Sequence, residues 1–229
     1  MADPARFRRT TAAAGLVGSA VLAAAATLIY RPTGGGVPAR VLDSLQRTPG
    51  AAQTSAVLFV LQGFAAILAA LAMGHLLRER FPLLSSVGAC LAAVGGFAEA
   101  VATTFTLVFV PMAQDPAHRG AYLGVLTRAD RVQNLFGLVG LAGTVIGALV
   151  LSIGIFRASV GPRWVAPAIW VFLVLEFVGS GAAPAVGLAA VTVGVLAYAA
   201  LAVTVWTSPL DGWRTATEAT APVAAPAPA

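Results

Sequence analysis

Residues 83–112 form one long apolar run that holds a single carboxyl side chain, that of Glu99, near its middle. At about 1.5 Å per residue, a helix of this length spans roughly 43 Å, which is enough to cross a lipid bilayer with some tilt. The whole chain is 59% hydrophobic and only 10% charged, a composition that excludes an ordinary soluble domain. The sequence therefore predicts a polytopic membrane protein.

Apolar runs of about 20 residues are typical of membrane-spanning helices, and such runs recur along this chain. We therefore expect an all-α transmembrane helix bundle of about six spans. The transmembrane domain is expected to cover residues 10–206, with spans near 10–30, 54–77, 83–111, 132–156, 165–180 and 185–206. A basic N-terminal segment, residues 1–9, precedes it, and the Ala-, Pro- and Thr-rich residues 207–229 are expected to form a disordered tail.

Two connections between the predicted spans have helical patterns of their own. In residues 38–47, Val41, Leu42 and Leu45 fall on one side, which favours a short helix lying in the membrane interface. A solvated loop turn is the alternative interpretation. The loop after the third span opens with Asp115-Pro116, a helix start signal, and predicts a second short interfacial helix on the same, outer side.

The distribution of arginine favours an orientation with both termini in the cytoplasm and a multi-pass location in the plasma membrane. The inner side would then carry Arg6, Arg8, Arg9, Arg78, Arg80, Arg157, Arg163 and Arg214, and the outer side Arg31, Arg40, Arg47, Arg119, Arg128 and Arg131. The complete absence of Lys suggests a GC-rich, bacterial genome. A cleaved signal peptide ending near Ala24-Ala25-Ala26 is the alternative interpretation of the first run.

The third and fourth predicted spans each carry a stripe of small and polar side chains at helical spacing. Such stripes let two helices approach closely in a membrane, so these two spans are expected to form a tight pair. The glycines expected at this contact are Gly88, Gly95, Gly137, Gly140 and Gly147.

Two carboxyl groups, those of Glu99 and Glu176, lie inside predicted spans. A charged side chain at the centre of a span costs about 2.5–3.5 kcal/mol on insertion scales, so such residues usually face the interior of a bundle. Hydrogen-bond partners are expected from Gln62, Thr103 and Thr144, which complete a candidate intramembrane polar site. Whether this site only joins helices or has a function is left open by the sequence.

No familiar catalytic or cofactor-binding motif occurs in the chain, so we expect no catalytic residues of a known class and no cofactor. Two histidines near the ends of apolar runs cannot build a metal site alone, and no metal is expected. The arginines do not form the basic stripe that follows a phosphate backbone, so nucleic acid is not an expected partner.

The order of these features resembles an uncharacterised family of six-span bacterial integral membrane proteins with a domain of unknown function. The similarity rests on the long loop after the first span, the Glu99-Ala100 pair, and the basic turn Phe156-Arg-Ala-Ser-Val-Gly-Pro-Arg-Trp164. It extends over residues 10–206. The resemblance implies a six-span architecture and supplies no mechanism.

Three classes of function stay open at this point. The favoured class is a structural or interaction protein of the lipid bilayer, or one that binds a lipophilic small molecule there. A proton-coupled transporter would use Glu99 and Glu176 as a relay. A membrane-embedded enzyme would act on a lipophilic, isoprenoid-like substrate, but few aromatic residues are expected in the interior to stabilise a cation.

Overall fold

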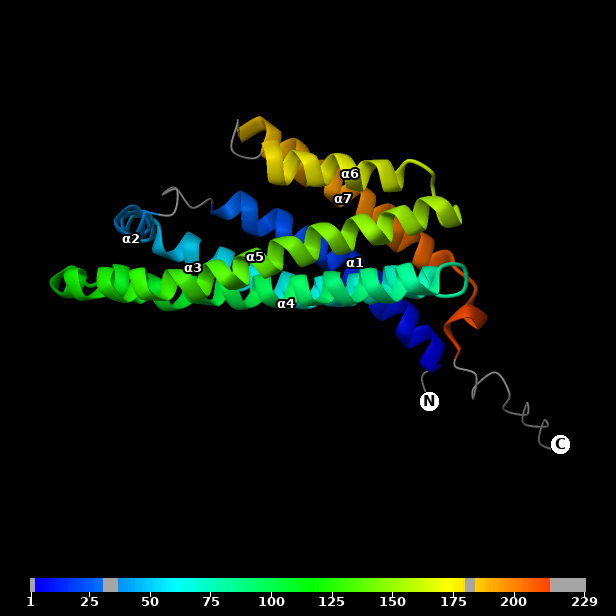
Figure 1. Ribbon diagram of the computed structural model, residues 1–229, viewed down its shortest axis with the longest axis horizontal. Coiled ribbons are helices and arrows are strands. Elements are labelled where there is room, and N and C mark those ends of the chain that lie inside the picture. The colour runs from blue at the N-terminus through cyan, green and yellow to red at the C-terminus, as the bar shows by residue number, and fades with distance from the viewer. Residues whose placement is uncertain (1–2, 31–36, 180–183, 215–229) are drawn as a thin grey trace, which may run out of the picture.

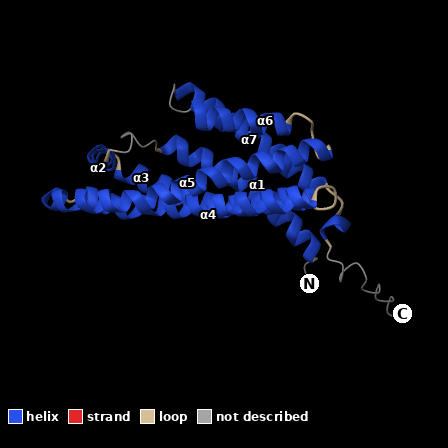
Figure 2. Cartoon of the chain, viewed as in Figure 1, coloured by secondary structure: helices blue, strands red, loops and turns tan. Residues whose placement is uncertain are grey.

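The computed structural model describes residues 3–30, 37–179 and 184–214, and every regular element in these ranges is helical (Figure 2). The helices are α1 (Pro4–Ile29), α2 (Pro38–Arg47), α3 (Pro49–Leu77), α4 (Pro82–Ala113), α5 (Arg119–Ala158), α6 (Val165–Val174) and α7 (Pro184–Thr207). Three short turns complete the structure: η1 (Pro116–His118), a π-helical turn η2 (Leu175–Gly179) and η3 (Leu210–Trp213). The predicted all-α fold is confirmed.

Six of the helices form a bundle along the long axis of the molecule, and α2 lies across one end of it (Figure 1). Successive bundle helices run in opposite directions, so that the first and last described residues lie at the same end. Five helices are long and apolar enough to cross a membrane. The fifth predicted span is the exception, because its apolar helix covers only Val165–Phe177. At about 1.5 Å per residue it is shorter than the roughly 30 Å hydrocarbon core of a bilayer.

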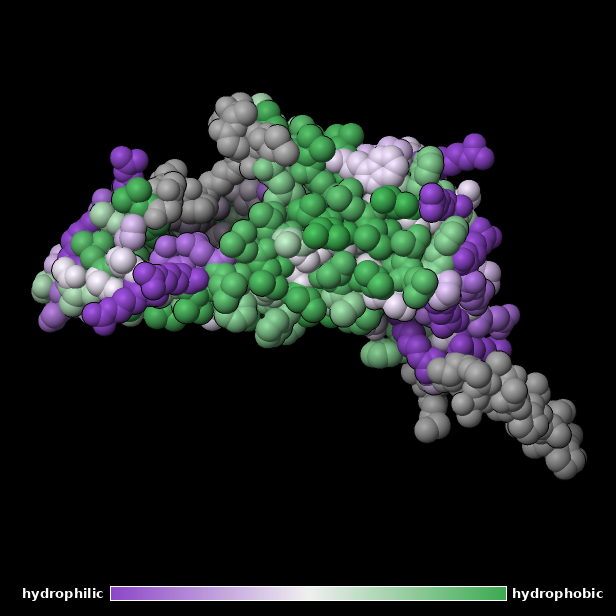
Figure 3. Space-filling model, viewed as in Figure 1, coloured by the Kyte–Doolittle hydropathy of each residue, from purple (hydrophilic) through white to green (hydrophobic). Residues whose placement is uncertain are grey.

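The outer surface of the bundle is suited to lipid. On the face shown in Figure 3, hydrophobic residues extend across the middle of the molecule and hydrophilic residues gather at its two ends. Large apolar side chains such as Phe64, Leu83 and Leu138 are at least 60% exposed. Soluble proteins rarely expose apolar patches of this extent, whereas a bilayer solvates them. The predicted membrane character of the chain is therefore supported by the surface as well as by the length of the helices.

The first predicted interfacial helix is present as α2. Its apolar side chains Leu42 and Leu45 are buried against the bundle. Two polar contacts hold it there: the hydroxyl groups of Tyr30 and Ser44 are 2.8 Å apart, and Arg119 pairs with Asp43 at 2.5 Å.

The second predicted interfacial helix does not exist as a separate element. Residues after the predicted helix start continue without a break into the fourth span, giving the single helix α5, Arg119–Ala158. The start signal itself is confirmed, because the Asp115 side chain accepts a hydrogen bond from the backbone N–H of Ala117. A hydrogen bond from His118 is the main cause that lowers the pKa of Asp115, and one from Tyr122 adds to it. No proline occurs between Pro116 and the end of α5, so nothing interrupts the backbone hydrogen bonds of the helix.

Both predicted terminal segments include residues that belong to helices or to the core. The basic residues of segment 1–9 belong to α1, which begins at Pro4 behind an Asp3 N-cap. Within the predicted tail, Trp213 is buried and its ring stacks on that of His75, with centroids 4.0 Å apart. Arg8 donates a hydrogen bond to the Trp213 carbonyl at 2.9 Å. Residues 215–229 of the predicted tail lie outside the described residues.

Helices α4 and α5 form the most extensive helix pair of the bundle and approach closely at glycines. A Cβ atom built on Gly95 would lie 2.3 Å from the Thr144 backbone nitrogen, and one on Gly147 would lie 2.4 Å from the Ala92 nitrogen. Gly88 and Gly140 are also against the partner helix. Gly137 is not, because a Cβ there would meet no atom within 4 Å. Gly137 therefore makes no close contact with α4 and was wrongly assigned to the helix contact.

Candidate functional site

The centre of the bundle contains a cavity of about 360 Å³, which we call the inner cavity. Each of the six bundle helices, counting η2 with α6, contributes to its wall. The five residues of the candidate polar site, Glu99, Glu176, Gln62, Thr103 and Thr144, all line it. They come from four different elements, so the fold gathers in one place the side chains that the sequence distributes over more than a hundred residues.

Glu99 is placed in the inner cavity by the close pairing of α4 and α5. A Cβ on Gly140 would lie 2.7 Å from Glu99 Cγ, so the glutamate side chain lies directly over this glycine. The Thr144 hydroxyl is beside the Glu99 carboxyl group. Its oxygen is buried and has no partner within hydrogen-bonding geometry among the described residues. The buried Thr144 hydroxyl and the Glu99 carboxyl group together make this part of the cavity wall polar.

Glu176 reaches the same cavity from the π-helical turn η2 at the end of α6. A π turn shifts the side chains that follow it around the helix axis, and such turns are frequent at functional sites. The Glu176 and Glu99 side chains are close enough to interact electrostatically. The two carboxyl groups therefore line the same cavity and would both contact a ligand bound there.

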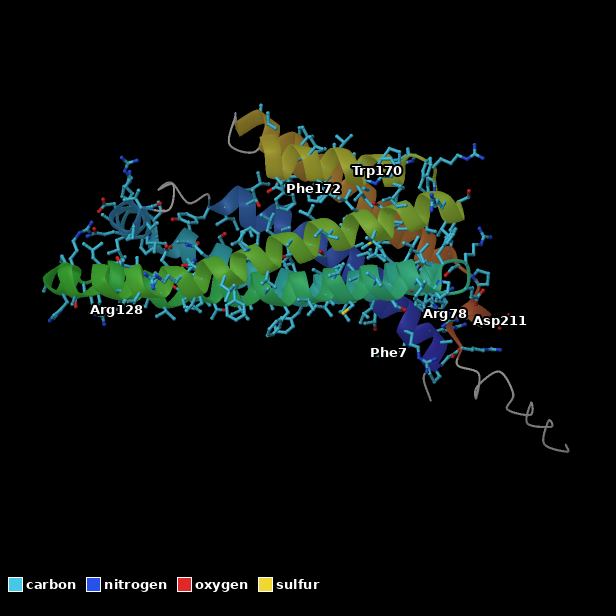
Figure 4. The ribbon with its side chains drawn as sticks, viewed as in Figure 1. Phe7, Arg78, Arg128, Trp170, Phe172 and Asp211 are labelled. Atoms are coloured by element: carbon cyan, nitrogen blue, oxygen red, sulfur yellow. The ribbon has the colours of Figure 1, made fainter. Side chains whose placement is uncertain are left out.

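Aromatic rings make up much of the remaining wall, contrary to the expectation of few aromatic residues in the interior. Phe59, Phe172, Phe177 and Tyr198 line the cavity together with the carboxyl groups. Phe172 comes from α6, on the side that faces the bundle (Figure 4), and its ring lies over Gly194, where a Cβ would be 2.9 Å from a ring carbon. The aromatic residues come from α3, α6, η2 and α7, and the sequence offered no periodic signal that joins them.

Sequence reasoning also missed the contribution of α1 and α7. Ser19 and Thr27 of α1, and Gly194 and Tyr198 of α7, line the inner cavity. Ser19 is a buried polar residue at the middle of the first span, and Tyr198 is a phenol inside the last one. A polar side chain inside an apolar run was the signal that could have pointed to both.

A second cavity of about 310 Å³, the outer cavity, lies at the α2 end of the bundle. Val41 and Leu45 of α2 line it, and so do the polar side chains of Thr106, Asp130 and Gln133. Phe59 and Thr103 line both cavities. The outer and inner cavities therefore adjoin at these two residues.

No group of three or more His, Cys, Asp or Glu side chains with the arrangement of a metal site occurs in the described part of the chain. Cys90 lies on the exposed outer face of α4. The site is thus built from two carboxyl groups, hydroxyl and amide groups, and aromatic rings.

Comparison with known proteins finds no matching family model, curated protein or solved structure. The resemblance to a six-span bacterial family stays a prediction.

Proposed function

We propose that this chain is a small-molecule-binding protein of the bacterial plasma membrane, with cytoplasmic termini, and that its ligand is a small organic cation held in the inner cavity. The observation that carries the proposal is the meeting of two carboxyl groups with four aromatic rings around one volume of about 360 Å³. Pockets for small molecules begin at about 300 Å³, so the ligand is small.

The chemistry of the wall favours a positive charge. A carboxylate in a low-dielectric cavity attracts a cation far more strongly than it does in water. Aromatic faces add about 0.5–2 kcal/mol for each well-placed cation, and they do so without hydrogen bonds. A quaternary ammonium group, which has no N–H donors and an apolar surface, suits such a wall better than a metal ion or a primary amine does.

Proton-coupled transport is the second candidate, and the adjoining cavities favour it. A proton and an organic cation cannot both occupy the same carboxylate oxygen, so binding of one releases the other. If the cation can leave toward a different side from the proton, this exchange becomes transport. Glu99 and Glu176 would be the exchanging groups in that mechanism.

Binding of benzyltrimethylammonium to the purified protein, measured by titration calorimetry in detergent at several pH values, tests the proposal. We expect saturable 1:1 binding that weakens as the pH is lowered, because protons compete for the carboxylate oxygens. Glu99→Gln and Glu176→Gln keep the side-chain shape but remove the charge, and each is expected to weaken binding at least tenfold.

The matched control is Glu79→Gln, which removes a carboxylate whose side chain is 81% exposed at the end of the bundle. Its binding should equal that of the parent. Absence of saturable binding by the parent protein, or unchanged affinity in both cavity variants, contradicts the proposed function. Gel filtration of each variant shows whether the protein is intact.

A further inference from the structure

The two cavities adjoin at Phe59 and Thr103, and different elements form their walls. The inner cavity is lined by the six bundle helices, whereas the outer cavity is partly formed by α2 at the end of the bundle. Asp130 and Asn134 stand at its outer part, and the Asn134 amide donates a hydrogen bond to Asp130 at 2.9 Å. We propose that the outer cavity is the water-filled entry to Glu99 from the α2 side of the membrane, and that Phe59 is the residue that closes it.

Polar side chains continue from the outer cavity to the inner one along α4. Thr106 lines the outer cavity, Thr103 lines both, and Glu99 lines the inner one. These residues follow at steps of three and four, which corresponds to about 4.5–6 Å along the helix. One water molecule bridges a gap of this size, so a short chain of water can reach Glu99 from the outer cavity. Gln133 of α5 lines the outer cavity on the opposite wall.

Phe59 is the apolar element at this junction. It comes from α3 and lines both cavities, and Ser55, one turn before it, lines only the outer one. Gln62, almost one turn after it, lines only the inner one. The ring therefore stands between the polar groups of the two cavities. A single aromatic side chain that interrupts a polar path controls passage by changing its rotamer, which takes no movement of the backbone.

The structure offers a matched pair of positions for a test. Thr103 and Thr104 are neighbours on α4, and each donates a 2.8 Å hydrogen bond to the carbonyl four residues before it. Thr103 lines both cavities, whereas Thr104 is exposed on the outer face of the helix, toward lipid. Replacement by Cys changes the two sites alike, but only a thiol in contact with water ionises and reacts.

The experiment measures the reaction of single-cysteine proteins in sealed vesicles of known orientation with small membrane-impermeant thiosulfonates of either charge. Cys90→Ala removes the natural thiol. We expect the Thr103→Cys variant to react at least tenfold faster than the Thr104→Cys variant, and only from the α2 side. Equal rates at the two positions, or reaction of Thr103→Cys only from the side of the termini, overturns the path. Full reaction of each variant after denaturation shows that its thiol is intact.

The closing role of Phe59 has its own measurement. A Gln62→Cys variant should react slowly from the α2 side, and Phe59→Ala or Phe59→Leu should raise that rate at least fivefold by opening the junction. An unchanged rate in both overturns the assignment of Phe59.

The path leads to the cavity of the proposed function, but its test uses no ligand. Successful labelling without cation binding contradicts only the proposed ligand. Cation binding without labelling contradicts only the path.

Discussion

At the scale of single residues, the Glu99 side chain both packs in the α4–α5 contact and supplies a carboxyl group to the inner cavity. It lies over Gly140 and beside the buried Thr144 hydroxyl. We expect Glu99→Gln to fold almost normally, because glutamine keeps the shape and can still form hydrogen bonds. Glu99→Leu leaves polar neighbours without a partner, which costs about 1–3 kcal/mol. The free energy of unfolding of both variants is measured in mixed micelles. Cys90→Leu, on the exposed face of α4, is the control and should leave this free energy nearly unchanged.

Gly140 determines where the Glu99 carboxyl group can lie. An alanine Cβ there would come within 2.7 Å of Glu99 Cγ and 3.0 Å of its backbone nitrogen. We expect Gly140→Ala to displace the carboxyl group and to weaken binding of benzyltrimethylammonium several-fold. The comparison is Gly124→Ala on the same helix, which adds the same methyl group where no atom lies within 4 Å and where the residue lines neither cavity. Equal affinity in the two variants would show that Glu99 has room to adjust.

At the scale of helices, the α4–α5 pair depends on the absence of side chains at a few positions. Gly147→Ala would place a methyl carbon 2.4 Å from the backbone nitrogen of Ala92, and backbone cannot move aside as a side chain does. Overpacking of this kind costs about 1–3 kcal/mol. Gly124→Ala, on the same helix with nothing within 4 Å, should instead stabilise by up to about 1 kcal/mol through helix propensity. The free energy of unfolding of both variants is measured in mixed micelles. An unchanged free energy of unfolding in Gly147→Ala would contradict the close contact between α4 and α5.

At the scale of the whole molecule, residues at the two ends of the bundle allow the proposed orientation to be tested. Arg78 and Asp211 lie at the end that also holds the first and last described residues, and Arg128 lies at the opposite end (Figure 4). Under the proposed orientation, a Gly120→Cys variant in the Cys90→Ala background should react with an impermeant reagent added to intact cells. A Glu79→Cys variant should react only after the cells are opened. The reverse pattern would invert the orientation and, with it, the side from which the outer cavity is entered.

The sequence by itself determined the class of fold and most of the spans, because length and hydrophobicity alone decide whether a helix can cross a bilayer. It also pointed to Glu99 and Glu176, since a carboxyl group inside an apolar run is costly and rarely accidental. It could not show that residues 119–158 form one helix, because polar and apolar stretches have similar helix propensity and only neighbouring elements determine where a helix ends.

Only the tertiary structure decided what surrounds the two carboxyl groups. The inner cavity is assembled from α1 and α3–α7 together with η2, and the side chains of Phe59, Phe172 and Tyr198 meet there although they are distant in the chain. Helical periodicity tells which residues share a face of one helix, but it carries no information on which faces of different helices meet. The same limit explains Gly137, which has the spacing of a contact residue but lines the inner cavity, where a Cβ would meet no atom within 4 Å.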